Sequence, residues 1–133
     1  MKTRMRWSHT TELPVDALSA SRARDFVGGH LNEHDLSDLA DDVRLVVSEL
    51  ATNALVHAQT PFTVILEALG PSVVLTVKDG STSEPVPVAT EDPDIDGRGI
   101  SIVQTLSRGW GVIVDGEGGK SVWAWFETDG APD

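Results

Sequence analysis

The sequence predicts an α+β fold, a two-layer sandwich in which helices cover one face of a mixed, mainly antiparallel β-sheet. Two observations predict this class. The expected elements follow the order helix, helix, β-hairpin, helix, β-hairpin. The expected strands are rich in β-branched residues, whereas the expected helices carry apolar residues three and four positions apart. No internal repeat is evident, so we expect a single domain over residues 1–133.

In the first half of the chain, residues 4–10 alternate weakly and predict an edge strand. Apolar residues at helical spacing then predict a helix over about 14–29 or slightly beyond, because a glycine pair is a common stop signal. A turn is expected at 32–35. A second helix is expected over about 36–58, with Pro61 as its stop signal.

In the second half, four runs rich in β-branched or aromatic residues predict two hairpins closed by glycine-containing turns. These runs are 63–69, 72–78, 110–114 and 121–128. Between the hairpins lies a long loop, 79–96, in which three prolines oppose regular structure, followed by a short helix over 97–107. A loop this long inside a small domain is uncommon and favours a functional role.

The composition limits the partners and the compartment. Lys and Arg number 10 against 21 Asp and Glu, and the formal net charge of -11 opposes binding to nucleic acid. No apolar run approaches the ~20 residues of a membrane span, and no apolar stretch follows the basic start. The chain has no cysteine, which excludes disulfides and thiolate metal sites. We therefore expect a cytoplasmic protein with neither nucleic-acid nor membrane partners.

The helix expected over 42–57 carries Glu49, Asn53 and His57 in one line, because steps of four residues advance only about 40° around a helix. Apolar residues cover most of the remaining circumference, which is typical of a helix packed on a core. Unsatisfied buried polar groups are costly, so the polar stripe predicts a cavity lining. The alternative is an exposed Glu49–Asn53 pair with His57 as a C-terminal cap.

A glycine motif, Gly97-Arg98-Gly99, stands at the junction between the long loop and the following helix. Glycines there allow backbone N–H groups to approach a phosphate, and a helix N-terminus favours negative charge. The alternatives are a lid hinge or an ordinary tight turn, with Arg98 as a solubilising surface residue. The GxxxxGK[ST] phosphate loop is absent, and the motif follows a loop rather than a strand, so it is no good dinucleotide fingerprint.

Asp79-Gly80 stands where a strand rich in Val and Leu leaves the sheet. A carboxylate at that point could accept a hydrogen bond from the exocyclic amine of a nucleotide. The alternative is a turn-forming Asp-Gly pair.

Together, Glu49-x-x-x-Asn53 on a helix, Asp79-Gly80 after a strand and Gly97-x-Gly99 opening a helix resemble the N, G1 and G2 boxes of the GHKL (Bergerat-fold) ATPases. The stretches SELATNALVHA, KDGS and GRGISIVQTLSRGWGV are most similar to the anti-sigma-factor serine/threonine kinases of the actinobacterial type. The resemblance covers about 13–127, which we take as the core, with a lid at about 80–96.

The resemblance implies a role for each matching residue. Glu49 would be the general base, and Asn53 would be the Mg²⁺ ligand. Asp79 would contact the adenine amino group, while a phosphate or loop-anchoring role for His57 competes with a core or capping role. The remaining expected nucleotide-binding residues are Gly80, Gly97, Arg98, Gly99 and Ile100.

The family's G1 box usually reads Asp-x-Gly, whereas Ser81 stands in place of its glycine here, which alters the approach of the loop to adenine. The implied function is an ATP- and Mg²⁺-binding regulator that phosphorylates a serine of an antagonist protein, sequesters a sigma factor, or does both. The alternative is a nucleotide-dependent protein-binding module without kinase activity. Relatives commonly form homodimers, so the resemblance implies a homodimer.

Overall fold

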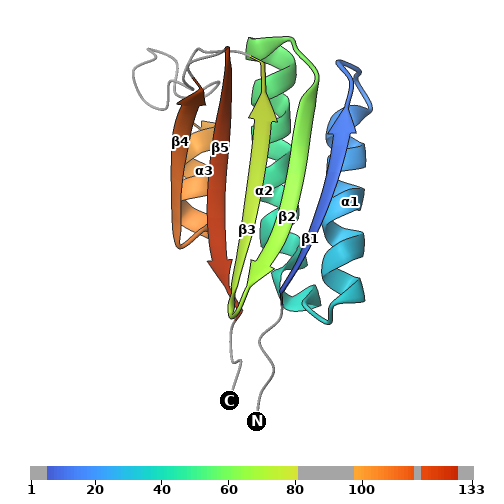
Figure 1. Cartoon of the computed structure of the whole chain (residues 1–133), viewed down its shortest axis with the longest axis vertical. Coiled ribbons are helices and arrows are strands. Elements are labelled where there is room, and N and C mark those ends of the chain that lie inside the picture. Colours follow the sequence, from blue (N-terminus) through green and yellow to red (C-terminus); the bar gives the residue numbers. More distant parts are fainter. Residues whose placement is uncertain (1–5, 81–97, 116–117, 129–133) are drawn as a thin grey trace.

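A computed structural model describes residues 6–80, 98–115 and 118–128 of the chain. Within these residues, five strands form one sheet and three α-helices lie against one of its faces (Figure 1). The strands are β1 (Arg6–Leu13), β2 (Phe62–Leu69), β3 (Ser72–Asp79), β4 (Gly109–Asp115) and β5 (Gly119–Glu127). The helices are α1 (Ser19–Glu33), α2 (Ala40–Asn53) and α3 (Arg98–Leu106).

The strand order in the sheet is β1-β2-β3-β5-β4, and all four pairings are antiparallel. The predicted α+β class and the one-sided helical layer are confirmed. The expectation of a mixed sheet is wrong for the described residues, because α3 returns the chain to the edge next to β5, where β4 runs antiparallel to it. The predicted edge strand is β1, which continues to Leu13.

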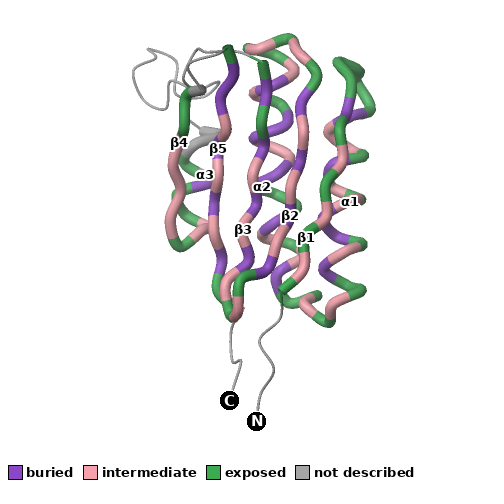
Figure 2. The backbone as a smooth tube through the Cα atoms, in the orientation of Figure 1, coloured by how far each residue is buried: buried purple, intermediate pink, exposed green. Residues whose placement is uncertain are grey.

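The core lies between the sheet and the helices, and it follows the alternation of the strands (Figure 2). Every second residue of β2 and β3 is buried, beginning with Phe62 and Val73. Val43, Val46 and Val47 of α2 are fully buried, as expected for the middle one of three helices. The apolar side of α2 thus faces the sheet while its partly polar side is available for a site.

Helix α1 begins and ends later than the sequence predicts. Before it, Asp16 closes a turn by accepting a hydrogen bond from the Leu18 backbone N–H at 2.7 Å, and Ser19 Oγ donates to the Pro14 carbonyl at 2.7 Å. The helix then continues through Gly28 because this glycine is buried against α2. A Cβ there would lie 3.2 Å from Cδ of Arg44. Packing therefore overrides the stop signal of a glycine pair.

The second predicted helix, 36–58, consists of three pieces. A 3₁₀ turn, Ser37–Leu39, leads into α2, and a π-helical turn, Ala54–Ala58, follows it. The chain leaves this turn through Gln59 in the left-handed conformation, with φ 58. A π turn changes the angular position of the residues that follow, so Asn53 and His57 are not held in the regular alignment that the sequence predicts.

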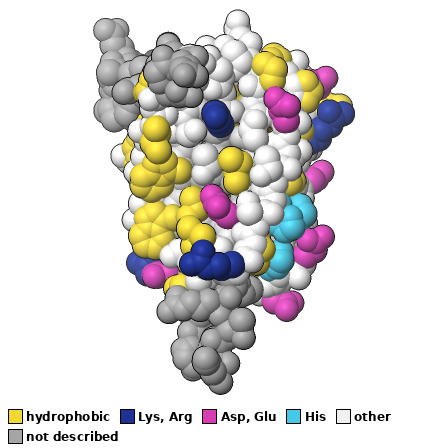
Figure 3. All heavy atoms as spheres, viewed as in Figure 1, with side chains coloured by type: hydrophobic (Ala, Val, Ile, Leu, Met, Phe, Trp, Pro, Cys, Tyr) yellow, Lys and Arg dark blue, Asp and Glu magenta, His cyan; other side chains and the backbone are white. Residues whose placement is uncertain are grey.

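The helix-free face of the sheet carries two half-buried indoles, Trp123 and Trp125, over β4 and β5 (Figure 3). They lie against two glycines of the neighbouring strand. A Cβ on Gly111 would be 2.5 Å from Trp123 Cζ2, and a Cβ on Gly109 would be 2.5 Å from Trp125 Nε1. These glycines are therefore required by the space that the rings occupy.

Candidate functional site

Three segments that the sequence singles out lie at the same end of the molecule. The C-terminal end of β3, the C-terminal half of α2 with its π turn, and the first residues of α3 are all at the top of Figure 1. The antiparallel topology explains this placement, because α3 runs back along the sheet before β4 begins. The end of a β-sheet is also where loops place functional side chains on a rigid frame.

Asp79, the last residue of β3, is buried and paired with a lysine. Its Oδ1 and Oδ2 accept hydrogen bonds from Lys120 Nζ at 3.1 and 2.9 Å. The two side chains are only 4% and 6% exposed, and the residues are cross-strand partners in the β3–β5 register. A buried carboxylate with a cation on both oxygens is held in one orientation, which suits a group that must recognise a ligand in one geometry.

Sequence reasoning did not identify Lys120 as a site residue. The signal that could have found it is the alternation of β5. Val122, Ala124 and Phe126 point into the core, which puts Lys120 on the same face. A lysine on a buried face requires an anionic partner, and the register between β3 and β5 identifies that partner as Asp79.

The chain next to Asp79 is fixed on both sides. The Gly80 backbone N–H donates to Thr60 Oγ1 at 2.9 Å, which ties the end of β3 to the segment after the π turn. On the other side, a Cβ on Gly119 would be 3.0 Å from the Asp79 carbonyl oxygen. Gly119 therefore permits the close approach of β5 that brings Lys120 to the carboxylate.

Glu49 and Asn53 lie one turn apart on α2 and are both half-buried. Within the described part of the chain, neither side chain has a hydrogen bond. Asn53 therefore offers a neutral amide oxygen that is available to a ligand, and this donor fits a hard cation such as Mg²⁺, which keeps several waters. His57 is exposed on the π turn and makes an interaction of its own, so it is not part of a buried stripe. The predicted cavity beside the stripe stays a prediction.

The glycine motif is described only in part. Helix α3 begins at Arg98, so Gly99 and Ile100 belong to its first turn, as the sequence predicts. The side chains of Arg98 and Ile100 are not described. Gly97, Ser81 and the predicted lid after Gly80 lie outside the described residues.

The family described as "Histidine kinase-like ATPase domain" matches residues 13–126, a region that includes the ends of α2 and β3 and the start of α3. The chain therefore belongs to the histidine kinase-like ATPase family, and this membership implies ATP binding. No curated protein matches the chain at a significant level. In the described part of the chain, none of the helices has the length and hydropathy of a membrane span.

Among solved structures, the RsbU and RsbW domains of Rv1364c from Mycobacterium tuberculosis have a similar fold, with a TM-score of 0.68 and 17% sequence identity. The match covers 91% of this chain but only 32% of that one, so the chain spans about a third of its length. At this identity the likeness concerns the fold alone. It agrees with the α+β class and the histidine kinase-like ATPase fold that the sequence predicts.

Proposed function

We propose that this chain binds ATP with Mg²⁺ at the end of the molecule described above and transfers the γ-phosphoryl group to a serine of an antagonist protein, with or without sequestering a sigma factor. The observation that carries the proposal is the buried Asp79–Lys120 pair at the end of β3, at the same end as Asn53 and the start of α3. A buried, oriented carboxylate is suited to recognising a base amine, and a helix N-terminus is suited to phosphate.

Each residue has one task in this proposal. Asp79 accepts a hydrogen bond from the adenine amine, and Lys120 is a positioning residue that fixes the carboxylate. The backbone N–H groups of Gly99 and its neighbours bind phosphate oxygens, with Arg98 as a charged donor, and Gly80, Gly97 and Ile100 line the nucleotide. Asn53 would hold Mg²⁺, which neutralises phosphate charge when bound. Glu49, one turn before Asn53, accepts the proton of the attacking serine hydroxyl.

The second candidate is a nucleotide-dependent protein-binding module that sequesters a sigma factor or another regulator without phosphorylating it. The net charge of -11 supports this candidate, because an acidic surface attracts basic protein partners and this attraction does not require phosphoryl transfer. A homodimer is compatible with both candidates. Phosphoryl transfer is the property that separates them.

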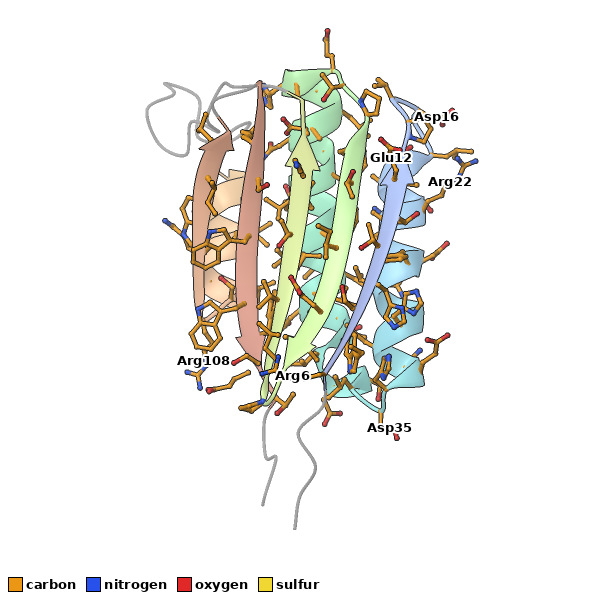
Figure 4. The ribbon with its side chains drawn as sticks, viewed as in Figure 1. Arg6, Glu12, Asp16, Arg22, Asp35 and Arg108 are labelled. Carbon is orange, nitrogen blue, oxygen red and sulfur yellow. The ribbon has the colours of Figure 1, made fainter. Side chains whose placement is uncertain are left out.

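The first experiment is a calorimetric titration of ATP and ADP with and without Mg²⁺. We expect Mg²⁺-dependent binding that is weakened by Asp79→Asn and by Asn53→Ala. Glu49→Gln should retain binding, because in this proposal Glu49 acts on the serine hydroxyl and does not hold the nucleotide. The matched control is Glu12→Gln, an exposed carboxylate on β1 (Figure 4). Absence of binding across the millimolar range would refute the proposal.

The second experiment uses γ-labelled ATP with candidate antagonist proteins from the source organism. Label on a serine of one antagonist, lost in Glu49→Gln and kept in Glu12→Gln, would support the kinase. Nucleotide-dependent association without label would instead support the binding module. Equal loss of ATP binding in Glu49→Gln and Asn53→Ala would make both residues structural.

A further inference from the structure

Three of the four histidines of the chain meet between the edge strand β1 and the helix α1, and β2 separates this edge from β3, whose end carries the nucleotide-site candidate. His9 is on the helix-facing side of β1, His30 is in the last turn of α1, and His34 follows its end. His9 Nε2 and His34 Nε2 are 3.0 Å apart, and the His9 and His30 rings are stacked at 3.7 Å. His30 Nδ1 lies 2.9 Å from Glu33 Oε1.

These distances place metal-binding atoms near one another. One ligand atom each from His9, His30 and Glu33 lies within 4.8 Å of the other two. In a tetrahedral site with bonds of 2.0–2.1 Å, neighbouring ligand atoms are roughly 3.3 Å apart. The 3.0 Å separation of the His9 and His34 nitrogens is close to such an edge.

The cluster is held by packing and is accessible from solvent. Trp7 stacks on the His34 ring at 4.0 Å with an interplanar angle of 6°, and Phe26 meets His30 edge-on at 4.8 Å. His30 and Glu33 nevertheless have side chains that are 25% and 63% exposed. In Figure 3 the histidines reach the surface beside acidic side chains, which attract cations. An ion can therefore reach groups whose orientation is already restricted.

Aromatic packing alone accounts less well for the composition of this cluster. Three imidazoles in contact repel one another once more than one is protonated, whereas apolar rings of similar size would pack without that penalty.

We propose that His9, His34 and Glu33 form a binding site for a divalent transition metal ion of the zinc class, separate from the nucleotide site. His9 and His34 would bind through their Nε2 atoms. The parallel His9 and His30 rings cannot both direct in-plane lone pairs at one ion, so the exposed Glu33 side chain completes the ligand set. His30, whose Nδ1 lies 2.9 Å from Glu33 Oε1, positions that carboxylate. Imidazole and carboxylate donors suit zinc, whereas Mg²⁺ prefers oxygen ligands alone. The inference does not depend on the proposed function.

The test is calorimetric titration of Zn²⁺ into the full chain without a histidine tag, in buffer free of nucleotide and then with excess Mg²⁺. We expect one zinc per chain, unaffected by Mg²⁺. His9→Ala should weaken binding by about 100-fold or more, because it removes the ligand that lies close to both His34 and Glu33. His57→Ala, which changes the fourth histidine, should leave zinc binding unchanged. Absence of zinc binding, or equal affinity in His9→Ala, would overturn the proposal.

A second arm is independent of whether His9→Ala folds. Glu33→Gln changes a side chain that is 63% exposed, so the variant should keep its fold and bind zinc about 10-fold more weakly or worse. In addition, Co²⁺ added to the unmodified chain should give the visible absorption bands of a four-coordinate N/O site and lose them on addition of Zn²⁺. Unchanged affinity in Glu33→Gln together with a cobalt spectrum like that of the free ion would refute the site.

Discussion

Lys120→Met is the perturbation that most directly tests the buried pair at the candidate nucleotide site. Methionine keeps most of the length and the apolar character of the lysine stem but removes the ammonium group. Lys120 Nζ is 2.9 Å from Asp79 Oδ2 and 3.1 Å from Oδ1, and the side chains are 6% and 4% exposed. The variant thus leaves a carboxylate in the core without its cation.

The expected loss of stability follows from these distances. At about 3 Å and an effective dielectric constant of about 20, the attraction between the charges is roughly 5 kcal/mol. Removing one partner of a buried pair destabilises a protein by about 3–5 kcal/mol, a large part of the usual 5–15 kcal/mol. For a domain of this size, such a loss lowers the melting temperature by roughly 10–20 °C. Replacing both partners by uncharged residues is expected to be far less harmful.

The assay is urea and thermal denaturation followed by circular dichroism on Lys120→Met, Asp79→Asn and the double variant. The control is Arg108→Met, which breaks an ion pair with Glu127 at 2.8 Å whose side chains are 63% and 41% exposed, and it should cost less than about 1 kcal/mol. The reasoning is refuted if Lys120→Met costs no more than Arg108→Met. It is also refuted if the double variant is no more stable than Lys120→Met.

Three further predictions concern the fold. Gly111→Ala should destabilise the protein by about 1–3 kcal/mol in urea denaturation, because its Cβ would lie 2.5 Å from Trp123. Gly29→Ala should instead stabilise α1 by about 0.5–1 kcal/mol, because its Cβ would have nothing within 4 Å. The opposite order of stabilities would refute the packing argument. Leu66→Ala, at a fully buried position of β2, should cost about 2–5 kcal/mol by the same measurement, and a loss below 1 kcal/mol would count against this core. Asp16→Ala should cost about 0.5–1.5 kcal/mol by removing the hydrogen bond before α1 (Figure 4), and an unchanged midpoint would show that the turn forms without it.

The elements governed by local pattern were predictable from the sequence. The hairpin of β2 and β3 lies within one residue of the predicted runs, since alternating buried side chains and Gly70, with φ 70, specify strands and turn locally. The start of α1 was not predictable. The stretch from Pro14 to Asp16 is typical of a helix start, but Asp16 closes a turn there and α1 begins only at Ser19. The end of α1 was not predictable either. Gly28 does not end the helix because it packs against Arg44 of α2, and this contact between two helices cannot be read from the local sequence.

Some residues of the candidate site could likewise be predicted from the sequence, and others could not. Asp79 and Asn53 could be singled out from the order and spacing of motifs along the chain. Lys120 could not be recognised as the partner of Asp79 without the β3–β5 register, which relates residues far apart in the sequence. The histidine cluster also could be predicted only in part. The spacing of His30 and His34 in the sequence places them one helical turn apart, but His9 reaches them only because β1 pairs with β2.

The glycines beneath the indoles have an evolutionary consequence. Two cross-strand pairs lie on the helix-free face of the sheet, Gly109 with Trp125 and Gly111 with Trp123. In each pair the indole ring occupies the space that a side chain at the glycine would need. A side chain on β4 is incompatible with the large ring opposite it, so substitutions should be accepted in pairs: a β-branched residue on β4 with a smaller residue on β5. A history of single changes at Gly109 or Gly111 would have to pass through less stable proteins. Related sequences should therefore show covariation at these two pairs.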